Sequence, residues 1–318
     1  MGPCTTLDWF PVTTQIRAFL WQDGRKDDLG TLGGDDASAN LINDLGMVGG
    51  ESYTNTTPNP STGVPTQNPF LWVDGKMLDL GTLGGTYGYP NWLNFWGQVV
   101  GRSNLAGDQS FHPFLWEAGA MHDLGTFGGA TGSAWWINDA GEIAGYADLP
   151  TNPTGCSGLT CVHHAFLWRR GVKTDLGTVG NDLCSRAFSI NLYGHLVGES
   201  ASVCGSNNTR AALWRDGVAY DLNALIPPSS DLTLQTAWDI NDRDEIAGDA
   251  VLSTGEETAF LLIPCDGDDP GGCTNPIEST AMVIEATARI TGNSASMKEG
   301  QSAARAVNPY SNQIGSRH

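Results

Sequence analysis

The sequence has few charged residues and very few basic ones. Charged side chains make up 16% of the chain, with 16 Lys and Arg against 35 Asp and Glu, for a formal net charge of -19. Nucleic-acid binding needs a basic surface to neutralise phosphates, and attraction to anionic lipid needs the same. We therefore expect neither nucleic acid nor membrane among the partners.

Long apolar runs are also missing. No stretch approaches the ~18 to 20 apolar residues of a membrane span, and residues 1–15 lack the basic and apolar regions of a signal peptide. Helical spacing is absent as well, because glycine, with 41 copies in 318 residues, interrupts the short apolar segments. An apolar share of 40% with 11 Trp still suffices for a packed core.

One phrase recurs along the chain. It reads AFLWQDGRKDDLGTLGG in its first copy and AFLWRRGVKTDLGTVGN in its fourth. The marker tryptophans lie 51, 44, 52 and 46 residues apart, at Trp21, Trp72, Trp116, Trp168 and Trp214. A sixth, partial copy has Leu262 in place of Trp. Self-similarity at this period indicates a repeat architecture.

A second phrase lies between the copies of the first, as in AWWINDAGEIAGYA and AFSINLYGHLVGES. Its asparagines lie 51, 44, 53 and 50 residues apart, at Asn43, Asn94, Asn138, Asn191 and Asn241. The two sets of markers keep the same step. The repeat is therefore far above chance.

Each repeat predicts four short strands. In the first phrase, dipeptides such as Asp74-Gly75 join two β-rich runs, which is a strong hairpin signal because glycine supplies positive φ. In the second phrase, Asn-Asp-x-Gly joins another two runs. A single four-stranded sheet cannot bury both faces, so the copies must pack face to face.

Four strands per 44 to 53 residues predict an all-β fold, specifically a β-propeller, with each GTLGG linker leading from the outer strand of one blade to the inner strand of the next. A β-solenoid is the second choice, since solenoid coils are usually shorter. Four complete strand sets, half a set at the start and three strands at the end leave three options. The blades number five with the ends paired, or six with incomplete first and last blades, or upstream repeats are missing.

The phrase His164-Ala165-Phe166-Leu167-Trp168, followed by Asp175-Leu176-Gly177-Thr178, resembles the HAF-type extracellular repeat family of bacteria. His112-Pro113-Phe114 is a near copy, whereas Arg17-Ala18-Phe19 and Asn68-Pro69-Phe70 depart from the triplet. The resemblance covers residues 16–265. It implies a secreted bacterial protein with a propeller-like fold and carries no catalytic residues.

Seven cysteines agree with an oxidising compartment. Their positions predict three local disulfides: Cys156 with Cys161, Cys184 with Cys204, and Cys265 with Cys273. Cys4 is then left over. The alternatives are buried free thiols or, less favoured, a zinc site of Cys156, Cys161 and the adjacent histidines, whose spacing is cramped.

The aspartate of the Asp-Leu-Gly motif recurs in every repeat, which favours a structural cap that accepts backbone N–H groups over a ring of catalytic carboxylates. The Asn-Asp pairs are expected to form turns. No cofactor is expected, although an acidic, glycine-rich turn could hold Ca²⁺ through hard oxygen ligands. Its residues are Asp266, Asp268 and Asp269.

Function on a repeat scaffold is expected where the repeats differ. Several aromatic and basic side chains break the pattern, and such groups suit sugar rings, which take flat apolar faces and bidentate hydrogen bonds. The candidate ligand-binding residues are Arg102, Trp92, Trp96, Tyr87, Trp135, Arg186 and His195. The alternative is that the tryptophans fill the packing between blades.

An enzyme would need a nucleophile or a pair of carboxylates. Weak candidates lie on or beside second strands, at Glu51, Glu142, Glu199 and Asp249. Sequence motifs of serine hydrolases, phosphate-binding loops and zinc proteases are absent. A hydrolase of glycosidase or esterase type, with its site in a central funnel, therefore stays an alternative.

The sequence predicts a propeller domain over residues 1–265 and a largely flexible tail over residues 266–318, in which residues 280–290 favour one short helix or strand. The expected role is binding of an extracellular carbohydrate or other polymer by a secreted monomer. The rivals are the hydrolase and a purely structural or adhesive surface protein.

Overall fold

The computed structural model describes residues 15–60, 62–150, 156, 158–264 and the backbone of 282–284. By its contacts the chain divides into two units, residues 1–287 and 288–318, and every described residue belongs to the first unit. Within the described residues the helical elements are two short 3₁₀ turns, Gly158–Thr160 and Leu222–Leu225, and no helix is long and apolar enough to cross a membrane.

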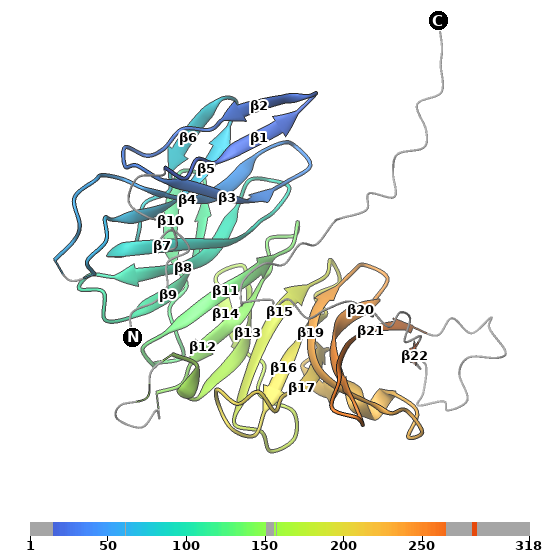
Figure 1. Cartoon of the computed structure of the whole chain (residues 1–318). Helices are drawn as coiled ribbons and strands as arrows, with labels where there is room; N and C mark the ends of the chain where they lie inside the picture. Colours follow the sequence, from blue (N-terminus) through green and yellow to red (C-terminus); the bar gives the residue numbers. More distant parts are fainter. Residues whose placement is uncertain (1–14, 61, 151–155, 157, 265–281, 285–318) are drawn as a thin grey trace, which may run out of the picture. The chain divides into compact units, whose positions relative to one another are not determined.

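The fold is all-β, and every repeat forms antiparallel strands in chain order (Figure 1). The chain opens with the hairpin β1 (Phe19–Gln22) and β2 (Arg25–Asp28). The first two complete repeats give β3 (Ala37–Ile42), β4 (Val48–Tyr53), β5 (Gln67–Val73), β6 (Lys76–Asp79), β7 (Gly84–Leu93), β8 (Val99–Leu105), β9 (Phe111–Glu117) and β10 (Ala120–Asp123).

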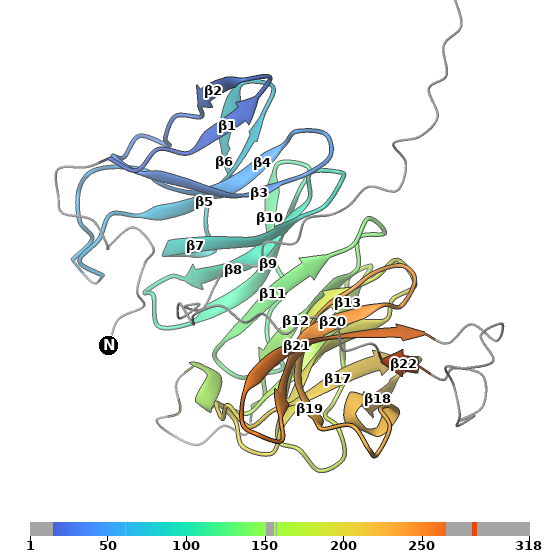
Figure 2. The same cartoon turned by 45° about the vertical axis from the view of Figure 1, so that its right-hand side comes forward.

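The remaining repeats continue the same order. They give β11 (Gly132–Ile137), β12 (Ile143–Asp148), β13 (His163–Arg169), β14 (Val172–Asp175), β15 (Cys184–Ile190), β16 (Leu196–Ala201), β17 (Arg210–Arg215), β18 (Val218–Asp221), β19 (Leu232–Ile240), β20 (Ile246–Leu252), β21 (Glu257–Pro264) and β22 (Met282–Ile284). The predicted strand sets are confirmed. Figure 2 shows the same succession turned by 45°.

The hairpins between third and fourth strands turn through two residues with positive φ, as the Asp-Gly signal predicts. The pairs are Asp23-Gly24, Asp74-Gly75, Ala118-Gly119, Arg170-Gly171 and Asp216-Gly217. Two consecutive left-handed residues define a type I′ turn, whose twist matches that of the strands it joins. Ala118 and Arg170 hold φ of 50° and 51° in these turns, a conformation that their side chains disfavour.

Every first strand contains a bulge opposite a glycine of the second strand. In β15 the register slips between Ala187 and Ser189, beside Gly198. A Cβ atom built on Gly198 would lie 1.9 Å from the Arg186 carbonyl oxygen, so no other residue fits there. The equivalent glycines are Gly50, Gly101, Gly145 and Gly248. A Cβ atom on any of these four would also clash with a phenylalanine ring of the third strand.

The apolar cores lie between successive sheets. One cluster joins Val100 and Leu115 of one sheet to Ala134, Ile137 and Phe166 of the next. First strands of neighbouring sheets also contact each other. Since each sheet buries one face on the preceding repeat and one on the following repeat, the packing argument made from the sequence holds for the interior sheets.

An asparagine ladder runs across the turns between first and second strands. Within its own turn, Asn138 accepts hydrogen bonds from the Ala140 and Glu142 amides through Oδ1. Its Nδ2 donates to the Asn191 carbonyl of the next repeat at 2.8 Å. The same step recurs from Asn43 to Asn94, from Asn94 to Asn138 and from Asn191 to Asn241. The marker asparagine thus forms the turn and also ties neighbouring repeats.

The Asp-Leu-Gly aspartates are structural caps, as predicted. Asp175 accepts from the Gly177 amide at 2.8 Å, and its two oxygens lie 2.9 and 3.0 Å from His164 Nδ1. The partner always stands eleven residues earlier, and it is Arg17, Asn68, His112 or Arg210 in the other repeats. The histidine of the HAF triplet therefore acts as the donor to this cap, and Arg or Asn performs the same task elsewhere.

The expected ring is not closed within the described residues. Contacts join each sheet to its neighbours along the chain, and none of the stronger contacts joins the β1–β2 hairpin to the sheet of β19 to β22. Closure by pairing of the two ends is therefore wrong for this part of the chain, because β1 pairs with β2 alone and β22 pairs with β21 alone. The blade number stays a prediction.

Two of the three predicted disulfides are confirmed. Cys156 is bonded to Cys161 and Cys184 to Cys204. The zinc alternative is wrong, because both of its cysteines are consumed in the first bond. Cys4, Cys265 and Cys273 lie outside the described residues. The predicted short element near residue 280 includes a strand, β22, which covers the edge of β21.

Candidate functional site

Polar side chains of several kinds occupy one equivalent position, the residue after the buried glycine of each second strand. We call this set the polar row; its members are Glu51, Arg102, Tyr146, Glu199 and Asp249. The position is fixed by the bulge and its glycine, so the backbone is the same in every repeat while the side chain changes. Four of the five members were candidates from the sequence.

In the second complete repeat the polar row carries Arg102, which lies among aromatic side chains. Its guanidinium is 5.4 Å from the centre of the Phe111 ring, and it is hydrogen-bonded to the Tyr87 hydroxyl. Tyr89 is the cross-strand neighbour of Arg102, and its hydroxyl accepts a hydrogen bond from Asn40 at 2.9 Å. Burial raises the pKa of Tyr87 and raises the pKa of Tyr89 to about 12, so both hydroxyls stay protonated.

Further along the polar row, Arg186 forms an ion pair with Glu199 on the adjacent strand. Arg186 Nε donates to Glu199 Oε1 at 2.9 Å, and Nη2 bonds the same oxygen. The second carboxylate oxygen accepts from Thr236 Oγ1 of the next sheet at 3.0 Å. The guanidinium lies 5.3 Å from the centre of the Phe188 ring, so Arg186, like Arg102, combines a charge with an aromatic face.

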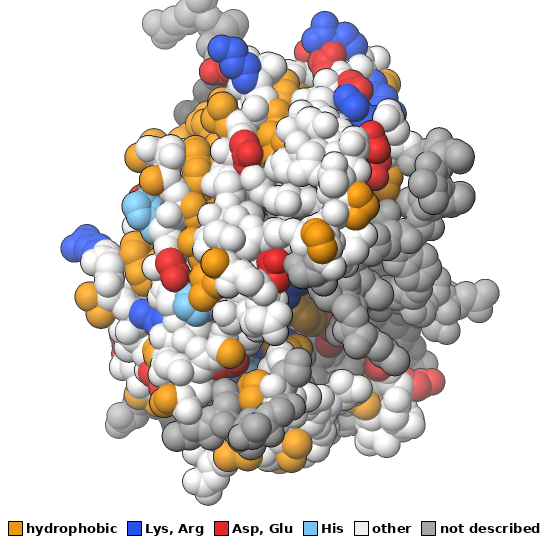
Figure 3. All heavy atoms as spheres, turned by 90° about the vertical axis from the view of Figure 1, so that its left-hand side faces the viewer, with side chains coloured by type: hydrophobic (Ala, Val, Ile, Leu, Met, Phe, Trp, Pro, Cys, Tyr) orange, Lys and Arg blue, Asp and Glu red, His pale blue; other side chains and the backbone are white. Residues whose placement is uncertain are grey.

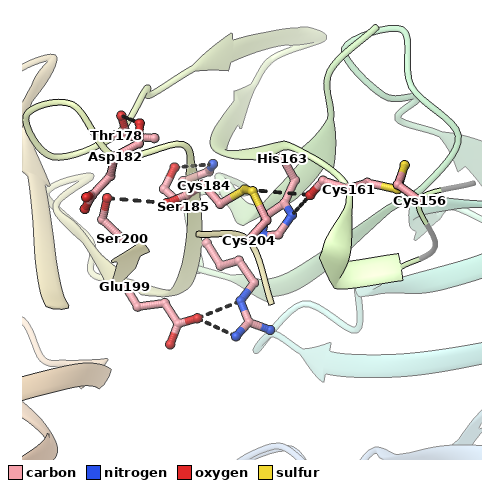
Figure 4. Close-up of a disulfide and its surroundings, with 12 residues drawn as sticks. Cys156, Cys161, His163, Thr178, Asp182, Cys184, Ser185, Glu199, Ser200 and Cys204 are labelled. Carbon is pink, nitrogen blue, oxygen red and sulfur yellow. Dashed lines mark hydrogen bonds and ion pairs between the residues drawn. A yellow bond between two sulfur atoms is a disulfide. The ribbon is translucent and has the colours of Figure 1, made fainter. Parts of the chain in front are cut away.

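Tyr146 feels the charge of both arginines. Burial raises the pKa of its hydroxyl, and the Arg102 and Arg186 guanidinium groups partly offset this rise. His163 stands beside it, with ring centres 5.2 Å apart and its Nδ1 bonded to the Cys161 carbonyl at 2.7 Å. Burial is the main reason that the pKa of His163 falls to about 4. Figure 4 shows His163, the two disulfides and the Glu199 ion pair in one neighbourhood.

An aromatic row follows the bulged positions of the last three first strands. Trp135 meets Phe188 edge to face at 5.6 Å between ring centres, and Phe188 lies 4.7 Å from Trp238. Trp238 is 47% exposed, and its indole N–H donates to Asp249 of the polar row at 2.6 Å. The equivalent positions of the first two complete repeats carry Asn40 and Asn91.

The other sequence candidates lie elsewhere. Trp92 stacks on Trp136 at 3.5 Å within the packing between sheets, as the alternative interpretation of the tryptophans expects. Trp96 and His195 occupy turns between first and second strands, at the opposite end of the sheets from the polar row. His195 pairs with Asp244 at 2.7 Å, and Glu142 pairs with Arg169 at 2.6 Å.

Among the hollows of the described surface, two have volumes of about 360 and 230 Å³. Arg210 and Asp221 are among the residues that line the first, and Tyr193, His195 and Trp214 among those that line the second. None of the four candidate carboxylates lines either hollow. On the face drawn in Figure 3, Lys and Arg side chains are few and hydrophobic ones form small separate groups.

A metal site gains no support from the part of the chain that the structure describes, which contains no group of three or more potential ligands. The candidate calcium ligands Asp266, Asp268 and Asp269 lie outside that part.

Sequence analysis missed Tyr146, His163, Phe188 and Trp238 as members of this region. A comparison of the repeats position by position would have shown Tyr146, since the residue after the glycine reads Glu, Arg, Tyr, Glu and Asp in turn. The bulged residues were harder to find, because a bulge adds one residue without changing the apolar pattern.

No family model matches the chain, and no curated protein matches it. Among solved structures, the β-propeller domain of the Trilobed protease from Pyrococcus furiosus is similar at 10% sequence identity, with a TM-score of 0.46, over 77% of this chain and 71% of that one.

Proposed function

We propose that this chain is a secreted repeat protein that binds an extracellular carbohydrate, or a similar polyhydroxylated polymer, along the polar row. The observation that carries the proposal is the pair of arginine–aromatic platforms, Arg102 with Phe111 and Arg186 with Phe188. A guanidinium offers a planar fork of donors, and the partly exposed Phe111 offers an aromatic face to the apolar side of a sugar ring, whereas Phe188 is 5% exposed and only supports its arginine.

Two further features support binding at this place. The hydroxyls of the partly exposed Tyr87 and Tyr89 stay protonated over the physiological range, so they donate as well as accept hydrogen bonds. Trp135 and Trp238 extend the aromatic surface across two further repeats. Equivalent positions on a repeating scaffold suit a repeating polymer, since each repeat meets a similar unit of the ligand.

The secreted location is part of the proposal. Two disulfides persist in oxidising compartments, which supports it. The resemblance to HAF-type repeats supports it as well, on the strength of the triplet and the Asp-Leu-Gly motif that the structure joins in one cap.

The test is a glycan panel on the purified chain, followed by calorimetry with the best binder. Arg102→Lys and Arg186→Lys keep the charge and remove the planar fork, and each is expected to weaken binding about tenfold. Arg25→Ala is the control, because its exposed side chain pairs only with Asp27 on the outer strand of the first hairpin. Binding that both arginine variants retain in full would overturn the site.

The same panel should include chromogenic glycosides and esters. Turnover that is lost in Glu199→Gln would favour the hydrolase over the binding protein. If neither binding nor turnover is found, the structural or adhesive role is the remaining explanation.

A further inference from the structure

Within the described residues, β1 has one unpaired edge. In the complete repeats the third strand pairs with a second strand on one side and a fourth strand on the other, whereas β1, which holds the place of a third strand, pairs among the described residues only with β2. As a result Phe19 is 49% exposed, although its equivalents Phe70, Phe114 and Phe166 are fully buried. Trp21 is 64% exposed, although its equivalent Trp214 is 1% exposed.

Among the residues that the structure describes, no further repeat packs on the outer face of the last sheet. Elsewhere the first strand of the following repeat packs on this face and buries small residues such as Ala144 and Ala165 completely. On the last sheet the equivalent residues Ala247 and Ala259 are exposed. The sheet of β19 to β22 is thus built to receive another first strand, and β1 is built to receive a second strand.

The chain holds one further copy of the phrase that forms first and second strands. Residues 302–316 read SAARAVNPYSNQIGS, and the fourth repeat reads SRAFSINLYGHLVGES from residue 185. Ala304, Val307, Asn308, Ile314 and Gly315 match Ala187, Ile190, Asn191, Val197 and Gly198 with the same spacing. These are the positions of buried packing, of the asparagine ladder and of the glycine opposite the bulge.

Two positions of this copy depart from the pattern. Ser311 stands where four of the five repeats have the turn glycine, and Gln313 stands where the repeats have a buried aliphatic residue. The step from Asn241 to Asn308 is 67 residues, longer than the other steps by about one loop. Both departures fall outside the residues that make the ladder and the glycine contact.

We propose that residues 302–316 form the first and second strands of the repeat whose third and fourth strands are β1 and β2. The register of the other repeats then pairs Gly315 with Phe19 and Ile314 with Leu20. The first strand of this hairpin covers the outer face of the last sheet, and the Asn241 amide finds the Asn308 carbonyl, one further step of the ladder. One hairpin thus pairs with the edge of β1 and also covers the last sheet, and six four-stranded repeats result.

Hydrogen exchange of the β1 amides tests the pairing, since a second strand protects amides of an edge that is unpaired within the described residues. In the full chain we expect exchange at Leu20 and Trp21 at least about tenfold slower than in a chain that ends at residue 301. Gly315→Val should abolish the protection, because a side chain at this position meets the opposing carbonyl. Gly300→Val is the control, since it changes the same residue type outside the matching segment.

Varying the protein concentration tests whether the hairpin that pairs with β1 comes from the same chain or from a second copy. Protection that is independent of concentration in a chain that sediments as a monomer is the expected result. Protection that grows with concentration, together with dimers or longer assemblies, would show that a second copy donates the strands and would overturn the intramolecular pairing. Equal exchange in the full and shortened chains would overturn the proposal altogether.

Discussion

Buried His163 is a single titratable residue that is expected to lower the stability of the fold at acidic pH. Its ring lies against Tyr146, and Arg186 and His164 are the charged or titratable groups that further lower its pKa after burial. Among the described residues, its ring has one polar partner, the Cys161 carbonyl, which Nδ1 contacts. A protonated ring would therefore be poorly compensated in this place.

Stability is expected to fall as the pH drops from about 6.5 to about 4. Over that range the unfolded chain binds a proton at this histidine and the folded chain does not, so protons favour unfolding by up to about 3 kcal/mol. Urea unfolding of wild type and His163→Gln at several pH values measures this loss. His122→Gln, an exposed histidine, is the control. A constant difference between wild type and His163→Gln across the range would contradict the assignment.

The type I′ turns give a second prediction for single residues. Ala118 holds φ of 50°, whereas Asp74 occupies the same turn position at the same angle. Since Asn and Asp tolerate this conformation better than Ala, Ala118→Asn should raise the free energy of unfolding by about 0.5 to 1 kcal/mol. Asp74→Ala should lower it by a similar amount. Chemical denaturation measures both changes. Destabilisation by Ala118→Asn would show that the positive φ of Ala118 does not cost stability in this turn.

Among the elements, the turn between first and second strands carries contacts both within and between repeats. Asn138 uses its oxygen within its own turn and its nitrogen on the next repeat and on Glu142. Removal of this side chain leaves several backbone groups without partners in a buried place. The asparagine ladder is thus a larger source of stability than a turn preference alone.

Asn138→Ala is expected to lower the free energy of unfolding by about 2 to 3 kcal/mol. Both this variant and its control, Asn241→Ala, are measured in the chain that ends at residue 301. There the exposed Asn241 side chain bonds Glu245 and the Arg243 and Glu245 amides of its own turn, and has no following repeat to reach. The cost of Asn241→Ala should be less than half as large. Equal costs at the two sites would mean that the bond between repeats contributes nothing measurable.

The elements were predictable because each one depends on local signals. Asp-Gly turns, Asn-Asp-x-Gly turns and the Asp175 cap all involve residues within a few positions of one another, so the sequence shows them directly. Contacts between repeats were not predictable in the same way. Nothing in the sequence says that the Asn138 nitrogen reaches Asn191, 53 residues away, or that Trp92 stacks on Trp136 while Trp135 meets Phe188.

At the scale of the whole molecule, a disulfide supports the candidate site. Cys184 begins β15, the strand of Arg186, and its bond to Cys204 ties this strand to the loop after β16. Cys184 Sγ also lies 3.7 Å from the Cys161 carbonyl oxygen, beside the second disulfide. Figure 4 shows both bonds in the neighbourhood of Glu199 of the polar row.

Replacement of Cys184 and Cys204 by serine is expected to lower the free energy of unfolding by about 3 kcal/mol, as the sequence separation of 20 residues predicts. The bond between Cys156 and Cys161 closes a much shorter loop, so replacement of these two cysteines should lower the free energy of unfolding by about 2 kcal/mol. Denaturation measures the stability, and calorimetry with the ligand found in the glycan panel should show a loss of affinity mainly in the first variant. A larger loss of affinity in the variant without Cys156 and Cys161 would show that the bond between Cys184 and Cys204 does not support the site.

Because each repeat is held chiefly by its two neighbours, tension applied to the ends of the chain should release the repeats one after another. Each event would lengthen the chain by roughly 15 nm or more, given about 3.5 Å for every extended residue. The fourth complete repeat would yield about 7 nm less, since the bond between Cys184 and Cys204 shields 20 residues from the pull.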